Sequence, residues 1–236
     1  MSKIICLWSC PRNVSTALMY SFAQRNDTDV FDEPLYAHYL RVSGSEHPGR
    51  NEIMNSLEND GDRVVKEVIL QESNKILFHK LMTHFLIDIN TAFLSLVKNI
   101  IFIRDPEEII SSYDKVIPNP TMNDIGIKKQ YDLYLFLEKS GCAPVVLDSK
   151  NLLKAPELIL RKLCSILGID FHDCMLKWEE GPIKEDGVWA KYWYANTHRS
   201  TGFLPFARQE NKLTKNNAEL AKMSLPYYNF LTSKSI

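Results

Sequence analysis

The chain has 236 residues, 45% hydrophobic and 24% charged, an ordinary globular composition with enough length to bury a sizeable core. Its 28 basic and 29 acidic residues nearly cancel, which argues against a nucleic-acid partner. No apolar run approaches the roughly 20 residues of a membrane span, and the first strand begins by residue 3, leaving no signal peptide. Five cysteines without a Cys-x2-Cys pair argue against structural zinc, so we expect a cytoplasmic protein that contains no metal and contacts no membrane.

The first twenty-two residues are predicted to form a strand, a loop and a helix. Residues 3–8 are mostly aliphatic, Pro11 marks a turn, and residues 17–22 continue at helical spacing. A helix start leaves backbone N–H groups unpaired and carries partial positive charge. With the guanidinium of Arg12 and the hydroxyls of Ser15 and Thr16, the loop is predicted to hold a phosphate or sulfate ester.

The residues of this loop separate the families that use such a cradle. A Walker A loop does not fit, because no glycine lies between Met1 and Arg41. Cys6 and Arg12 satisfy Cys-x5-Arg, so the stretch superficially resembles the signature of low-molecular-weight tyrosine phosphatases. A phosphatase cysteine must be a thiolate at the mouth of the loop, whereas Cys6 lies inside the strand. We interpret Cys6 as a buried small hydrophobe and keep a Cys6-dependent phosphatase as an alternative.

Residues 11–16, Pro-Arg-Asn-Val-Ser-Thr, resemble the 5′-phosphosulfate loop of sulfotransferases. In that family a proline, a cation, two small residues and a Ser/Thr pair open the first helix. The resemblance implies that the loop binds 3′-phosphoadenosine-5′-phosphosulfate (PAPS) and that its cation also serves catalysis. The implied donor contacts here are Arg12, Asn13, Val14, Ser15 and Thr16. Val14 stands where glycine is often found, which leaves a non-catalytic nucleotide-binding relative as a further alternative.

Residues 29–31 are predicted to form a short strand, and Pro34 to begin a helix capped by Asp32. Residues 43–50 are the most loop-like stretch of the chain and form either a lid or a surface connection.

Glu-Pro followed by aromatic residues also resembles short sulfotransferases, in which this segment lines the acceptor pocket. The resemblance implies acceptor contacts by Glu33, Tyr36 and His38.

Residues 62–68 are predicted to form the next strand. The run from Lys80 to His84 resembles the sulfotransferase segment in which a histidine general base follows a short Lys/Thr stretch, and it implies that His84 is the base. A hydrogen-bonded core histidine is the alternative for His84, and His79 is the nearest rival as base. Lys80 either adds charge to the site or solvates a surface.

Residues 99–113 are predicted to be an apolar strand followed by a helix. Asp105 is the expected N-cap and Pro106 the first helical residue. Arg104 then stands at the carboxyl end of a strand, where ligands bind in open α/β sheets. An ion pair with a neighbouring acid is the plainer role for Arg104. An arginine with a serine eight residues later resembles the 3′-phosphate motif of sulfotransferases, and this implies that Arg104 and Ser112 hold that phosphate.

Further helices are expected at residues 124–139 and 156–167, and a strand at 144–148. Strands near residues 3, 64, 99 and 144, alternating with helices, predict a parallel sheet and an α/β fold. We therefore expect one domain over residues 1–236. The resemblance implies that it is a three-layer α/β/α domain of the P-loop NTPase-like sulfotransferase fold.

The segment 178–236 begins with seven aromatic rings in under thirty residues and ends in a helix, 216–231, interrupted by Pro226. We expect the segment to pack over the nucleotide and acceptor site, and its rings also suit a homodimer contact. Residues 198–203 resemble the basic, glycine-containing loop with which sulfotransferases close over the nucleotide. The donor contacts implied there are Arg199, Thr201 and Gly202.

Together these resemblances imply an enzyme that moves a sulfuryl group from PAPS to a hydroxyl or amine of a small-molecule acceptor, without a metal. The acceptor itself is not identified by the sequence.

Overall fold

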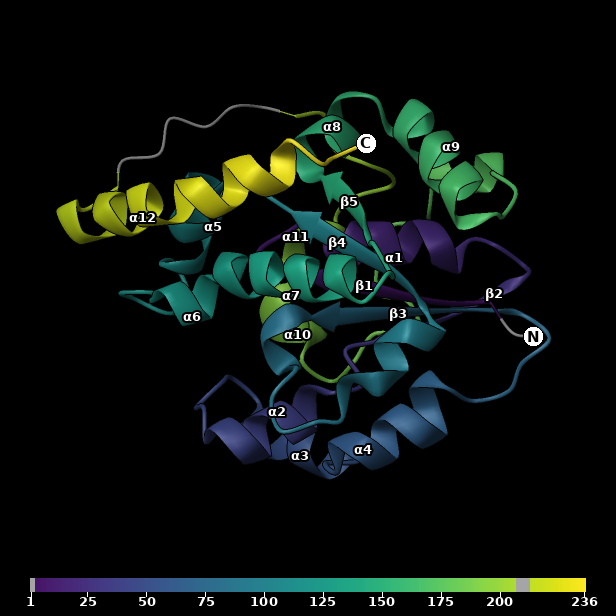
Figure 1. Cartoon of the computed structure of the whole chain (residues 1–236), viewed down its shortest axis with the longest axis horizontal. Coiled ribbons are helices and arrows are strands. Elements are labelled where there is room, and N and C mark those ends of the chain that lie inside the picture. Colours follow the sequence, from purple (N-terminus) through teal and green to yellow (C-terminus); the bar gives the residue numbers. More distant parts are fainter. Residues whose placement is uncertain (1–2, 207–212) are drawn as a thin grey trace.

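The computed structural model describes residues 3–206 and 213–236. Within these residues one five-stranded parallel sheet has the order β2-β3-β1-β4-β5, which confirms the predicted α/β class (Figure 1). The strands are β1 (Ile4–Ser9), β2 (Thr28–Asp32), β3 (Ile76–Met82), β4 (Lys98–Ile103) and β5 (Val145–Asp148). Because the chain crosses from β3 on one side of β1 to β4 on the other, the carboxyl ends of these central strands border the crevice where such sheets bind ligands.

Helices connect the strands. The α-helices are α1 (Ser15–Ala23), α2 (Tyr36–Ser43), α3 (Arg50–Ser56), α4 (Gly61–Val64), α5 (Pro106–Tyr113), α6 (Met122–Ile125), α7 (Ile127–Lys139), α8 (Ser149–Lys154), α9 (Pro156–Leu167), α10 (Ala190–Trp193), α11 (Ala195–His198) and α12 (Lys215–Thr232). A π-helical turn covers Val65–Ile69, and 3-10 turns cover Thr83–Phe85, Thr91–Leu96 and Asp173–Leu176. None of the helices in the described part of the chain is long and apolar enough to cross a bilayer.

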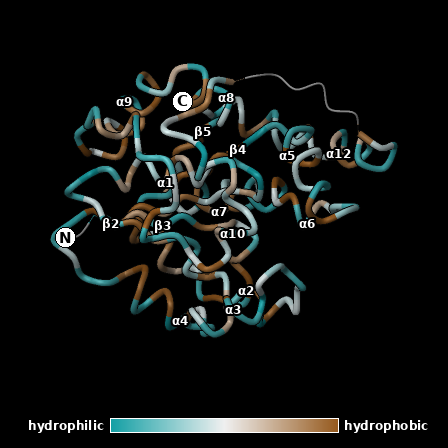
Figure 2. Tube along the Cα trace, turned by 180° about the vertical axis from the view of Figure 1, so that it is seen from behind, coloured by the Kyte–Doolittle hydropathy of each residue, from teal (hydrophilic) through white to brown (hydrophobic). Residues whose placement is uncertain are grey.

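The sheet is the middle of three layers because side chains alternate along each strand. On β1, Ile5 and Leu7 pack with α1, α8 and α9, whereas Cys6 and Trp8 pack with α2, α7 and α12 on the other face. Figure 2 shows hydrophobic stretches gathered along the strands, with hydrophilic connections around them. This sandwich fixes the strand ends that carry the candidate site.

One predicted strand is wrong. Residues 62–68 are helical rather than a strand: Asp60 accepts a hydrogen bond from the Arg63 amide at 3.0 Å and caps α4. That cap outweighs the preference of β-branched valines for strands. The strand that was missed is β3, which carries Lys80.

The helix expected at Pro34 begins instead at Tyr36. Glu33 adopts a left-handed backbone with φ 45° and donates its amide to the carbonyl oxygen of Lys80 at 2.8 Å. Asp32 is consequently the last residue of β2 rather than a helix cap. Pro226 does not interrupt the terminal helix, since α12 continues through it.

Candidate active site

The loop between β1 and α1 is held open by polar contacts to β4. Asn13 donates from Nδ2 to the carbonyl oxygen of Phe102 at 2.6 Å and accepts from the Val14 amide at 2.7 Å. Arg104 Nη1 donates to the carbonyl oxygen of Arg12 at 2.6 Å, and Arg12 adopts a left-handed φ of 57°. Among the described residues no side chain caps α1, so its first-turn amides are left to an anion.

The second predicted motif meets the first. Asp105 caps α5 as expected, accepting from the Glu107 amide at 2.9 Å, and Pro106 opens the helix. Arg12 Nε donates to Ser112 Oγ at 3.0 Å. Arg104 also pairs with Glu108 at 2.8 Å, which confirms the plainer ion-pair role without removing Arg104 from the site.

Arg12 and Arg104 place two guanidinium groups side by side in a partly buried site. Burial lowers the pKa of Arg12, and the charge of Arg104 lowers it further. An anion bound between them would relieve both effects. The geometry therefore suits a phosphate or sulfate better than a neutral ligand.

A cavity of about 550 Å³ lies over this loop. The predicted residues that line it are Arg12, Asn13, Val14, Ser15, Thr16, Glu33, Tyr36, His84, Arg104, Ser112 and Gly202. Residues 193–206 of the aromatic segment supply another wall. Three predicted residues lie outside the lining formed by the described residues: His38, Arg199 and Thr201.

His84 lies in the turn that follows β3 and faces this cavity. Its Nδ1 is buried, and no partner for it exists among the described residues. Burial lowers the pKa of His84 to about 3, with smaller contributions from His47 and Lys129. The imidazole is therefore neutral at pH 7. The rival His79 lies within β3, stacked 4.6 Å from the ring of Phe31 and outside the cavity lining.

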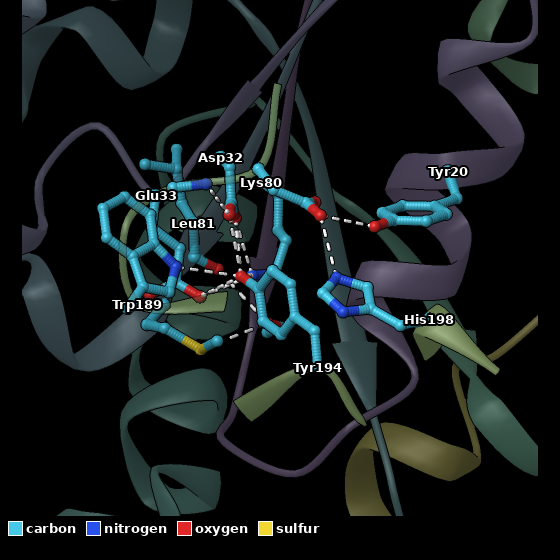
Figure 3. Close-up of polar contacts among 12 residues, drawn as sticks. Tyr20, Asp32, Glu33, Lys80, Leu81, Trp189, Tyr194 and His198 are labelled. Atoms are coloured by element: carbon cyan, nitrogen blue, oxygen red, sulfur yellow. Dashed lines mark hydrogen bonds and ion pairs between the residues drawn. The ribbon is translucent and has the colours of Figure 1, made fainter. Parts of the chain in front are cut away.

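Beside His84 the structure holds a buried ionic network that the sequence did not reveal. Lys80 is 0% exposed and pairs with Asp32 at 2.8 Å and with Glu33. Tyr194 accepts from Lys80 at 2.6 Å and from Trp189 Nε1 at 3.0 Å, and donates to Asp32 at 2.8 Å. Figure 3 shows Lys80 and Tyr194 together at the centre of these contacts. Lys80 is thus a site residue rather than a surface charge.

A second set of contacts ties the aromatic segment to α1. Asp186 accepts from the hydroxyl of Tyr20 at 2.6 Å and contacts His198 Nε2 at 2.9 Å. The amide of the next residue, Gly187, donates to Asp32 at 3.1 Å, which joins the two sets. Tyr20 and His198 lie to one side of Tyr194 in Figure 3. These bonds fix the wall that residues 193–206 present to the cavity.

His38, an expected acceptor contact, has a structural role. Its Nδ1 accepts from the Gly61 amide at 3.0 Å, and its Nε2 lies 2.8 Å from the carbonyl oxygen of Ile87. It therefore joins α2 to the start of α4 and to the connection that contains Ile87.

Arg199 is exposed and donates to Ala195 and Asn196, which closes the end of α11. Thr201 is exposed next to Gly202, whose backbone alone reaches the cavity lining.

Cys6 is 0% exposed inside β1, and burial strongly raises the pKa of its thiol. The buried-hydrophobe interpretation is confirmed, because a phosphatase needs an accessible thiolate.

Comparisons with known proteins agree with this geometry. Two curated Arabidopsis thaliana proteins, branched-chain-amino-acid aminotransferase-like proteins 1 and 2, are 41% and 38% identical over 98% and 97% of the chain. The chain spans only 42% and 41% of their lengths, so their whole-protein names do not describe it.

Two solved structures share the fold. They are the sulfotransferase domain of the Synechococcus PCC 7002 olefin synthase and a sulfotransferase domain from the curacin biosynthetic pathway, with TM-scores of 0.54 and 0.53. Each is 15% identical and covers 94% of the chain, which in turn covers 95% and 97% of those domains. A family model described as a sulfotransferase domain matches residues 2–235. The chain therefore belongs to the sulfotransferase domain family.

Proposed function

We propose that this protein transfers a sulfuryl group from PAPS to a hydroxyl or amine of a small-molecule acceptor, with His84 as general base. The observation that carries the proposal is one cavity lined by Arg12, Arg104, Ser112 and His84. These residues come from three separate motifs of the chain.

The donor half of the cavity fits the two charged ends of PAPS. The uncapped start of α1, with Ser15 and Thr16, supplies donors for the 5′-phosphosulfate. Arg104 and Ser112, one before and one within α5, are assigned to the 3′-phosphate. When bound, PAPS supplies the sulfuryl group and the phosphate leaving group.

The protein's task in this reaction is positioning and charge neutralisation, as in phosphoryl transfer. The bond between the acceptor oxygen and sulfur forms while the bond between sulfur and the phosphate oxygen breaks. His84 takes the acceptor proton, and the electron pair leaves with 3′-phosphoadenosine-5′-phosphate (PAP). Arg12 stabilises the charge that develops on the departing phosphate. The proposal assigns no step to a metal.

The test is transfer of label from radiolabelled PAPS to a panel of phenols, alcohols and amines, with PAP release measured in parallel. We expect labelled product, and we expect Cys6→Ala to retain it because Cys6 is sealed inside β1. Hydrolysis of p-nitrophenyl phosphate that disappears in Cys6→Ala would support the phosphatase instead.

A further inference from the structure

The cavity divides into a donor half and an acceptor half. Ser111 and Ser112 each lie three or four residues from Glu108 and from Lys115, so all four share the face of α5 and its extension that borders the donor loop. The other half is formed by the ends of β2 and β3 and the segments that follow them. Its lining residues include Glu33, Tyr36, His47, Lys80, His84 and Phe85.

The acceptor half has no uncommitted cation among the described residues. Four lysines and arginines line the whole cavity, and Arg12, Arg104 and Lys115 belong to the donor half. The fourth, Lys80, is held by two carboxylates and the Tyr194 hydroxyl. An acceptor bearing a carboxylate, sulfate or phosphate would find no counter-ion here.

Glu33 leaves this half of the cavity with an unmatched acceptor atom. Both oxygens of Asp32 are engaged, by Lys80, Tyr194 and the Gly187 amide. Glu33 uses Oε1 for Lys80, whereas Oε2 meets no donor among the described residues. One lysine therefore faces two carboxylates, and the trio carries one net negative charge when all three are ionised.

Glu33 itself borders the cavity, in an unusual backbone conformation. Glu33 is 4% exposed and lines it. Its left-handed φ of 45° is unusual for a residue other than glycine and is held by the hydrogen bond from its amide to the Lys80 carbonyl oxygen. Strained backbone of this kind is concentrated at functional sites. Burial raises the pKa of Glu33, whereas the charge of Lys80 acts in the opposite direction.

The remaining walls are aromatic. Tyr36 and Phe85 both line the cavity and stack with ring centroids 5.0 Å apart, while Trp189 supports Tyr36 from outside the lining, edge to face at 5.2 Å. These faces suit an apolar body, and an aromatic face next to a carboxylate also attracts an organic cation.

We propose that the acceptor is a hydroxyl compound with an apolar body and a protonated amine, and that Glu33 Oε2 is the counter-ion of that amine. This inference rests on the proposed function: the hydroxyl lies at His84 while the ammonium lies at Glu33. Glu33 is thereby the residue that selects a positively charged acceptor over a neutral or negatively charged one.

The test uses three para-substituted phenols of similar size but different charge: tyramine, 4-propylphenol and 3-(4-hydroxyphenyl)propanoate. Calorimetry measures the binding of each to the protein saturated with PAP. Since a hydrogen bond to a charged group contributes about 1.5–3 kcal/mol, we expect tyramine to bind roughly 10- to 100-fold more tightly than 4-propylphenol. The anionic phenol should bind most weakly.

Glu33→Gln should reduce the preference for tyramine over 4-propylphenol to about twofold or less. Because this preference is a ratio of two affinities, a change that weakens both phenols equally does not alter it. Asp29→Asn is the matched control: it removes a carboxylate from β2, the strand that Glu33 follows, where Asp29 pairs with Lys75 at the surface, and it should keep the preference. Equal binding of tyramine and 4-propylphenol to the wild-type protein, or no binding of either, would overturn the inference. A tyramine preference that survives Glu33→Gln would also overturn it. Binding of PAP alone, measured first, tests the proposed function separately.

Discussion

Arg12 Nε lies 3.0 Å from Ser112 Oγ, although the two residues are 100 positions apart in the chain. One belongs to the loop after β1 and the other to α5, which follows β4. Because β1 and β4 are neighbouring parallel strands, their carboxyl ends bring both segments to the same crevice. Two motifs assigned to opposite ends of one nucleotide therefore share a site.

Ser112→Ala should weaken PAP binding by about tenfold, since a hydrogen bond to a charged group contributes about 1.5 kcal/mol or more. Adenosine 5′-phosphate, which has no 3′-phosphate, should lose little affinity. Ser165→Ala, on the exposed face of α9, is the control. An equal loss for both nucleotides in Ser112→Ala would place Ser112 away from the 3′-phosphate.

His84→Ala should lower kcat by about 10²- to 10⁴-fold, the usual contribution of a general base. PAP affinity should change little, because the base contacts the acceptor rather than the nucleotide. Single-turnover kinetics with radiolabelled PAPS separate the two effects. Unchanged transfer in His84→Ala would assign the base elsewhere.

The buried histidines predict a loss of stability in acid. Burial lowers the pKa values of His79 and His84 to about 3, whereas an unfolded histidine titrates near pH 6.5. Between these values the unfolded chain binds more protons, so the free energy of unfolding falls as the pH drops from 6.5, by about 1.4 kcal/mol per unit for each histidine. Urea unfolding at pH 7, 6 and 5 should show this slope, and His79→Phe should remove about half of it. Parallel curves for the two proteins would contradict the assignment.

Lys80→Met should destabilise the fold by about 3–5 kcal/mol, because it leaves two buried carboxylates without their cation. Lys75→Met removes a lysine that pairs with Asp29 at the surface, and should cost about 1 kcal/mol or less. Thermal unfolding of both variants makes the comparison. Similar losses in the two would show that the Lys80 network contributes little.

The donor half of the site could be predicted because its signals are local. Asp105 and Pro106 are adjacent and together predict the start of a helix, and the aliphatic run of β4 predicts that Arg104 lies at a strand end. The loop that contains Pro11 likewise lies directly between its strand and its helix in the sequence, so all three could be predicted from one short stretch. Overlooking a local cap led to one wrong prediction: Asp60 caps α4, where a strand was expected.

Glu33, Tyr36 and His84 were expected in the acceptor half, but its ionic network could not be predicted, because the contacts of that network join distant positions. Lys80 and Tyr194 are 114 residues apart, and neither neighbourhood in the sequence points to the other. The left-handed backbone of Glu33 arises from pairing with β3, itself a missed strand. His38 and Arg199 were assigned by position in a motif, whereas both side chains bond to backbone groups outside the cavity lining: His38 to distant Gly61 and Ile87, and Arg199 to nearby Ala195.

The central claim is that Arg12, Arg104 and Ser112 hold one nucleotide through both of its charged ends. Calorimetric titration of the wild-type protein with PAP and with adenosine 5′-phosphate tests it most directly. Arg104→Ala is the variant, and Arg161→Ala, at an exposed position of α9, is the control. We expect PAP to bind at least about tenfold more tightly than adenosine 5′-phosphate, and Arg104→Ala to abolish the difference. Equal affinity of the wild-type protein for the two nucleotides would contradict the claim.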